Sequence, residues 1–297
     1  MKKSIKIFLK LEKGDKILVI GGAGFIGSHL CELLYFKGMK VTSLDNYFTG
    51  STSNHIDGVE YINGNSEDIE KLIDFSPKII FHLGEYSRVE QSFEDIDKVW
   101  KYNIVSILNI LKFAKNNNSK IIYAGSSTKF GDIGKESSPY AFSKATNTEF
   151  VINYSKWFNL DYAITYFYNA YGPREINQGQ YATIIAKFLS QAKKKQPLTI
   201  VKPGTQKRNF THVEDIVNGL YLVGLRGKGD GYGIGSDKVF SIQEVANLIS
   251  NNQVFLPSRL GNRNSAELKT SKTISLGWKP KKNLEAYIKK ELENKKL

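Results

Sequence analysis

The chain has 297 residues, of which 41% are hydrophobic and 24% are charged, and its formal net charge is +13. This composition is typical of a globular protein with a substantial core. No apolar run approaches the roughly 20 residues that a membrane-spanning helix needs, and the single cysteine, Cys31, excludes an intrachain disulfide. We therefore expect a cytoplasmic protein that has no membrane partner.

The excess of positive charge raises the question of nucleic-acid binding. However, the lysines concentrate at residues 193–195 and in the tail at residues 279–296, as is typical of solvated helix faces and chain ends. We predict no nucleic-acid partner, although a positive field would suit a diphosphate substrate. The four histidines lack the i, i+4 spacing of paired ligands and one thiolate cannot build a zinc site, so we also predict no metal.

Residues 1–15 form a basic leader, after which short β-branched runs alternate with helical patterns as far as residue 173. This alternation predicts an α/β protein with a doubly wound parallel sheet covered by helices on both faces. The expected strands are Lys16–Ile20, Val41–Leu44, Val59–Ile62, Ile79–Leu83, Lys120–Ala124 and Tyr162–Phe167. The expected helices are Ile26–Lys37, Ile69–Asp74, Val99–Asn116 and Ala141–Phe158.

The rhythm of the sequence changes after Pro173. Further helices are expected at residues 181–193, 213–223 and 241–251, the last opened by a Ser241 and Glu244 capping box. We therefore expect residues 16–173 to form a Rossmann-type domain, with residues 174–297 mainly a smaller substrate-binding region packed beside it.

A glycine-rich turn, Gly-Gly-Ala-Gly-Phe-Ile-Gly at residues 21–27, joins the first strand to the first helix. Glycines permit a tight turn whose backbone N–H groups, with the helix N-terminus, can bind a pyrophosphate. Asp45 ends the second strand at the spacing of a carboxylate that binds the adenosine ribose. Its charge would repel a 2′-phosphate, which favours NAD over NADP, although both motifs also suit plain structural turns. The predicted NAD-binding residues here are Gly21, Gly24, Phe25, Ile26, Gly27, Asp45 and Asn46.

Tyr140 and Lys144 lie four residues apart, on one face of an expected helix. A phenol on its own ionises near pH 10, so it needs a nearby cation to act as a base near neutrality, and Lys144 supplies one. Ser126, at the end of the fifth strand, is placed to hydrogen-bond both Tyr140 and a reacting hydroxyl. We predict that these three residues are catalytic.

These motifs, together with Asn-Ala-Tyr-Gly-Pro-Arg at residues 169–174, resemble the extended short-chain dehydrogenase/reductase family, specifically its NAD-dependent nucleotide-sugar epimerases and dehydratases. The similarity runs from Lys16 to about Tyr287. It implies a nucleotide-diphosphate sugar as substrate. Tyr140 would remove a proton from a sugar hydroxyl, usually at C4, as hydride passes to the nicotinamide, and Lys144 would hold the nicotinamide ribose.

The same resemblance assigns further residues of the site and an assembly. It implies that Leu83, Gly84 and Asn103 contact the cofactor. It implies that Asn169, Arg208 and Arg259 bind the diphosphate of the substrate. It also implies a homodimer, formed by the helices at residues 99–116 and 141–158, both of which carry apolar residues at helical spacing.

The residues after Ser126 favour one reaction type. Dehydratases of this family usually have an Asp-Glu pair there, because eliminating water needs an acid and a base, whereas this chain has Ser127 and Thr128. We therefore predict an epimerase that acts at C4 through a 4-keto intermediate. A 4,6-dehydratase that uses Glu85 and Lys129 stays an alternative, although a solvent-facing charge is the simpler interpretation of both. A non-catalytic dinucleotide- or nucleic-acid-binding protein on this fold would leave the predicted catalytic residues without a purpose.

Overall fold

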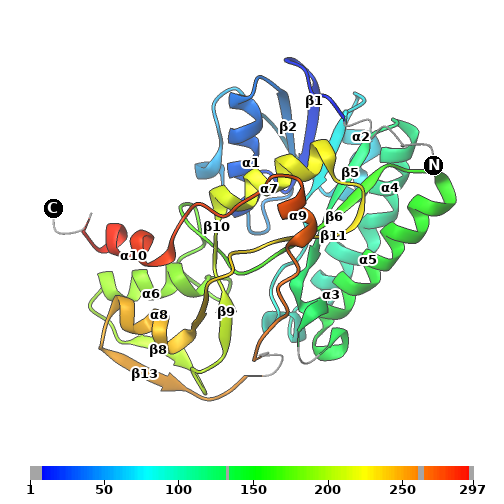
Figure 1. Cartoon of the computed structure of the whole chain (residues 1–297). Helices are drawn as coiled ribbons and strands as arrows, with labels where there is room; N and C mark the ends of the chain where they lie inside the picture. Colours follow the sequence, from blue (N-terminus) through cyan, green and yellow to red (C-terminus); the bar gives the residue numbers. More distant parts are fainter. Residues whose placement is uncertain (1–8, 132–133, 260–263, 294–297) are drawn as a thin grey trace, which may run out of the picture.

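Seven parallel strands form the central sheet of the protein, in the order β11-β6-β5-β4-β1-β2-β3 (Figure 1). The structure is a computed structural model, and it describes residues 9–131, 134–259 and 264–293. The strand order runs outward in both directions from β1 and β4, which places a crevice at their carboxyl ends. The strands are β1 Lys16–Ile20, β2 Lys40–Asp45, β3 Glu60–Asn63, β4 Ile79–His82, β5 Lys120–Ser126, β6 Tyr162–Phe167 and β11 Gly229–Ile234.

Alternate residues of each central strand enter different cores. Ile17 and Val19 of β1 pack in the core that lies beneath α1 (Phe25–Phe36) and α7 (Val213–Arg226). Leu18 and Ile20 pack in the opposite core, beneath the helices of the other layer. Strands covered on both faces are expected to be apolar throughout, and this explains why the six predicted strands were visible as short apolar runs. The helices of the second layer are α2 Ile69–Leu72, α3 Ile96–Val99, α4 Ser106–Asn116 and α5 Pro139–Phe158.

A third core belongs to the smaller region, seen at the lower left of Figure 1. Its centre is a layer of α6, α8 and α10 over the paired strands β8 and β13. The predicted capping box is confirmed, since the Ser241 hydroxyl accepts from the Glu244 N–H and the Glu244 carboxylate accepts from the Ser241 N–H. The elements between the large sheet and this region, and within it, are β7 Ala170–Tyr171, α6 Ile184–Lys193, β8 Leu198–Val201, β9 Lys207–Asn209, β10 Thr211–His212, β12 Val239–Ser241, α8 Ile242–Ile249, β13 Gln253–Leu256 and α10 Leu284–Glu293. The short helix α9 Ser271–Ser275 packs instead on β11 and α7.

Three of the differences from the sequence prediction concern the large sheet and the crevice. The seventh strand, β11, was not predicted, and with α7 it brings chain from beyond residue 173 back to the large sheet. The helix expected at residues 99–116 contains a π-helical segment at Trp100–Val105. The helix expected from residue 181 begins only at Ile184, because the residues before it form a loop over the crevice.

Cys31 is fully buried, as expected for a packed core thiol, and burial raises the pKa of that thiol. In the part of the chain that the structure describes, no helix is both long and apolar enough to cross a membrane. The same part contains no group of three or more His, Cys, Asp or Glu side chains placed to hold a metal ion.

Candidate active site

A crevice of about 790 Å³ opens at the carboxyl ends of the central strands. Its walls come from both parts of the molecule, from the glycine-rich turn after β1 to Arg208 beside the smaller region. The structure therefore brings nearly all the predicted site residues together around one cavity. Those that line it are Gly21, Gly24, Phe25, Ile26, Gly27, Asp45, Asn46, Leu83, Gly84, Ser126, Tyr140, Lys144, Asn169, Arg208 and Arg259.

The glycine-rich turn is shaped by close backbone contacts. Gly21 has a φ of +86°, and a Cβ on it would lie 2.6 Å from the Gly84 backbone. A Cβ on Gly27 would lie 2.0 Å from the Gly21 carbonyl oxygen. The N-cap of α1 is Gly24, so no side-chain hydrogen bond caps the first N–H groups of that helix. The first residues of α1 line the crevice. A bare helix N-terminus behind a close-packed glycine turn fits a pyrophosphate.

Asp45 holds this turn in place at the end of β2. Its carboxylate accepts hydrogen bonds from the Ala23 N–H at 2.9 Å and the Tyr47 N–H at 2.8 Å. Burial raises the pKa of Asp45, and these hydrogen bonds act against that rise. Asp45 closes the strand-end turn and also lines the crevice. A structural role in the turn and a role in binding the adenosine ribose are therefore compatible.

The predicted base and its partner meet at the rim of the sheet. The Tyr140 hydroxyl, on the first turn of α5, donates to the Ser126 Oγ at 3.1 Å. The Thr128 hydroxyl donates to the same Oγ at 2.8 Å. Ser138 caps α5 by accepting from the Ala141 N–H, and this fixes the helix start against the end of β5. Two hydroxyls thus face the crevice side by side, as proton transfer to a bound alcohol requires.

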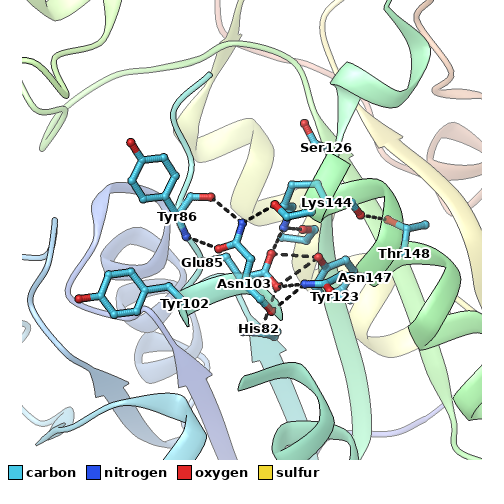
Figure 2. Close-up of polar contacts among 12 residues, drawn as sticks. His82, Glu85, Tyr86, Tyr102, Asn103, Tyr123, Ser126, Lys144, Asn147 and Thr148 are labelled. Atoms are coloured by element: carbon cyan, nitrogen blue, oxygen red, sulfur yellow. Dashed lines mark hydrogen bonds and ion pairs between the residues drawn. The ribbon is translucent and has the colours of Figure 1, made fainter. Parts of the chain in front are cut away.

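Lys144 lies one turn further along α5, and its ammonium contacts the Ala124 carbonyl and the Glu85 carboxylate (Figure 2). The Glu85 side chain is only 3% exposed, so its interpretation as a solvent-facing charge is wrong. Tyr123 and Asn147 each donate to this carboxylate at 2.9 Å. Burial alone would raise the pKa of Glu85, but Lys144 and His82 outweigh burial and lower it to about 2.

Asn103 does not line the crevice, contrary to its predicted cofactor contact. Its side chain is fully buried within the π-helical segment, where it accepts from the Tyr86 N–H at 2.7 Å and donates to Ser143 at 2.9 Å. The physical reason is that the π-helical turn directs the amide to the backbone of the loop after β4 (Figure 2). Asn103 therefore supports the crevice wall from behind.

The substrate end of the crevice carries several cations. Arg208 hydrogen-bonds to the Lys207 and Asn264 carbonyls, and Arg259 forms an ion pair with Glu90. Lys187 of α6 also lines this end of the crevice, and burial and Arg259 lower its pKa; the sequence analysis did not identify it. Residues 260–263, directly after Arg259, lie outside the described residues. A diphosphate is a suitable ligand for such a group.

The sequence analysis also missed Arg88, in the loop after β4. Its Nε and Nη2 donate to the Tyr181 carbonyl at 2.9 and 2.6 Å, and the Tyr181 hydroxyl donates to Asp95 at 2.6 Å. These bonds attach the loop before α6 to the sheet side of the crevice. A lone arginine in a polar loop gives no sequence signal for such a tie.

We expect Glu175, in the same loop, to make a pH-dependent contribution to stability. Its carboxylate accepts from Thr183 and Gly172, but burial dominates and raises its pKa to about 7. Between pH 4.5 and 7 the folded chain retains a proton that the unfolded chain releases, so the free energy of unfolding falls as pH rises. We expect Glu175→Gln to remove a dependence of about 1.4 kcal/mol per pH unit within this window.

Urea unfolding of the two proteins from about pH 4.5 to 8 measures this difference. The exposed Glu94→Gln is the matched control and should leave the pH dependence of wild type unchanged. A constant difference between Glu175→Gln and wild type at every pH would contradict the prediction.

Known proteins of one enzyme family resemble this chain in sequence and in fold. A sequence model of the NAD-dependent epimerase/dehydratase family matches residues 17–235. A putative UDP-glucose 4-epimerase of Methanocaldococcus jannaschii is 30% identical, over 92% of this chain and 96% of that protein. UDP-glucuronic acid decarboxylase 2 of Arabidopsis thaliana is also 30% identical, over 92% of this chain and 66% of that protein. The solved UDP-glucose 4-epimerase of Thermus thermophilus in complex with NAD is 25% identical, with a TM-score of 0.86 over 95% of this chain and 99% of that one.

Proposed function

The chain belongs to the NAD-dependent epimerase/dehydratase family, and we propose that it is an NAD-dependent epimerase that inverts C4 of the sugar in a nucleotide-diphosphate sugar. One observation carries the proposal. The Tyr140 hydroxyl lies 3.1 Å from Ser126 Oγ, in a crevice that Lys144, the glycine turn and the group of cations also line. A base, a hydrogen-bonding partner and two anion-binding ends therefore share one cavity.

The residues present fit NAD. The turn of Gly21 and Gly27 with the α1 N-terminus would hold the pyrophosphate, Asp45 the adenosine ribose and Lys144 the nicotinamide ribose. NAD, when bound, accepts hydride from the sugar carbon and returns it. Arg208 and Arg259 would hold the substrate diphosphate at the opposite end of the crevice.

The proton steps fall to the chain's own side chains. Tyr140 takes the proton of the C4 hydroxyl while Ser126 aligns that hydroxyl by a hydrogen bond. The resulting 4-keto sugar turns over in the crevice and presents its other face. Tyr140 then returns the proton to the C4 oxygen, so the reaction consumes no reductant overall.

The local structure supports epimerisation over dehydration. The positions after Ser126 hold Ser127 and Thr128, which do not supply a carboxyl pair. Glu85 is bound to Lys144, and Lys129 forms an ion pair with Asp230 at 3.4 Å. The unconventional acid and base that a dehydratase would need here are thus each committed to another partner.

The test is incubation with a panel of neutral and acidic sugars linked to UDP, GDP, dTDP, CDP and ADP. We expect a product of unchanged mass whose proton NMR spectrum shows inversion at C4. Loss of water would identify a dehydratase and loss of carbon dioxide a decarboxylase, and either result would overturn the proposed reaction. The panel also identifies the nucleotide and the sugar.

We further propose that the enzyme is a homodimer that pairs α4 and α5. Large apolar side chains are exposed on this side of the molecule, among them Trp100, Leu108 and Trp157. In a dimer with a two-fold axis the same residues of both subunits lie in the interface, so one substitution places a charge there in each subunit. We expect Leu108→Asp to convert the dimer to a folded monomer, as measured by sedimentation equilibrium at micromolar concentration.

The control is Phe255→Asp, which adds the same charge at an exposed apolar residue of β13 in the smaller region. It should leave the mass in solution at that of wild type. A monomeric wild type, or a dimer that survives Leu108→Asp, would contradict the proposed assembly.

A further inference from the structure

The Glu85 carboxylate is enclosed by groups from three elements of the sheet layer. His82 Nε2 of β4 lies 3.4 Å from Oε1, the Tyr123 hydroxyl of β5 donates to Oε2 at 2.9 Å, and α5 contributes Lys144 and Asn147 (Figure 2). Asn147 also donates to the Asn103 carbonyl at 2.9 Å, which ties the cluster to the π-helical segment. Two neutral donors and one ammonium thus bind this carboxylate, and an imidazole lies next to it.

A buried carboxylate is costly unless it is paired and hydrogen-bonded. At an ordinary core position an apolar side chain of similar volume would be at least as stable. Packing alone therefore does not explain why a charged residue occupies position 85. The Glu85 carboxylate binds the Lys144 ammonium, which is expected to face the nicotinamide ribose.

A lysine side chain has a flexible stem and three N–H donors. In this structure the Ala124 carbonyl and the Glu85 carboxylate take two donors of Lys144, and the Tyr123 ring lies 4.5 Å from its Nζ. The described part of the chain supplies no third acceptor for this ammonium, so one N–H is left for a ligand in the crevice. The surroundings thus fix both the place of the ammonium and the direction of its remaining donor.

We propose that Glu85 is a positioning residue, whose buried carboxylate fixes the Lys144 ammonium at the wall of the crevice. The inference rests on the proposed function, because it concerns the same base and the same cofactor site. The titratable groups that face Glu85 are His82, Tyr123 and Lys144. Burial raises the pKa of Tyr123 well above its usual value, so this phenol stays a neutral donor.

The test is the steady-state kinetics of Glu85→Gln, which keeps the shape of the side chain and removes its charge. Without the carboxylate the ammonium loses its ionic partner, so we expect kcat to respond to this substitution more than KM does. The maximal kcat should fall about tenfold, with a smaller change in KM, because the ammonium is less well placed.

Two control variants separate charge from structure. Glu85→Asp keeps the charge and should recover most of the kcat that Glu85→Gln loses. Asp230→Asn removes a carboxylate that pairs with Lys129 outside the catalytic crevice, and it should leave kcat at that of wild type. Equal losses of kcat in Glu85→Asp and Glu85→Gln, or a loss expressed mainly in KM, would overturn the inference, because the charge would then not position the ammonium.

Urea unfolding provides a second readout that does not need turnover. We expect Glu85→Gln to lower the unfolding midpoint in wild type, where it leaves a buried ammonium without its ionic partner, but to raise the midpoint in the Lys144→Met background, where it removes a buried carboxylate that has lost its cation. Equal losses in both backgrounds would overturn the inference. A wild type that converts no nucleotide sugar would instead overturn the proposed function, and this cycle would still decide whether Glu85 holds Lys144.

Discussion

Tyr140→Phe is expected to lower kcat by about 10³-fold, because it removes the atom that accepts the proton of the sugar hydroxyl. The phenol oxygen hydrogen-bonds to Ser126 at the edge of the crevice, so its loss leaves no buried donor or acceptor unpaired in the core. The variant should therefore fold and bind NAD as wild type does. Turnover of the nucleotide sugar that the panel identifies is the measurement, with NAD affinity followed by fluorescence.

The control for this variant is Tyr154→Phe on the same helix. Tyr154 is buried against Phe150 and Phe158, away from the crevice. Removing its hydroxyl should leave kcat within about twofold of wild type, as is usual for a change away from the reacting atoms. Substantial turnover by Tyr140→Phe would show that another group is the base.

The elements that could be predicted are those whose signal lies within a short stretch of sequence. Strands covered on both faces are apolar throughout, so β1, β4 and β5 were recognisable as short runs. The glycine turn could be placed because it directly follows β1. In a parallel sheet the carboxyl ends of the strands meet at one edge, so the order of the motifs was enough to gather Asp45 and Ser126 around one crevice.

The parts that could not be predicted depend on distant partners. Glu85 meets Lys144 across 59 positions of sequence, and no local pattern distinguishes such a carboxylate from a surface charge. Asn103 turns inward because the helix passes through a π-helical segment, which apolar periodicity does not reveal. The family resemblance implied that Asn103 contacts the cofactor, whereas its side chain hydrogen-bonds to the Tyr86 backbone.

The missed strand has a different explanation. β11 reads Gly-Asp-Gly-Tyr-Gly-Ile, which lacks the β-branched run of the central strands. Its glycines are needed for close packing, since a Cβ on Gly233 would lie 2.1 Å from the Lys269 carbonyl oxygen. Glycine in a strand weakens the sequence signal where another backbone approaches closely. Edge position and tight packing together hid this element.

Gly27→Ala is expected to weaken NAD binding by about 10- to 100-fold, which corresponds to the 1–3 kcal/mol of a typical overpacking strain. The added methyl would lie 2.0 Å from the Gly21 carbonyl oxygen. Gly21 cannot move back, because its α-carbon already packs against the Gly84 backbone. The turn must therefore shift into the space that the pyrophosphate needs.

Ser28→Ala is the matched control for this change. Ser28 is the next residue of α1, is fully buried, and donates its hydroxyl to the Phe25 carbonyl at 3.1 Å on the side away from the crevice. Its replacement costs one local hydrogen bond, about 1 kcal/mol of stability, and should leave NAD affinity unchanged. Calorimetric titration with NAD separates the two cases. Equal affinities of Gly27→Ala and wild type would mean that the dinucleotide lies elsewhere, since a pyrophosphate on this turn cannot tolerate the displaced backbone.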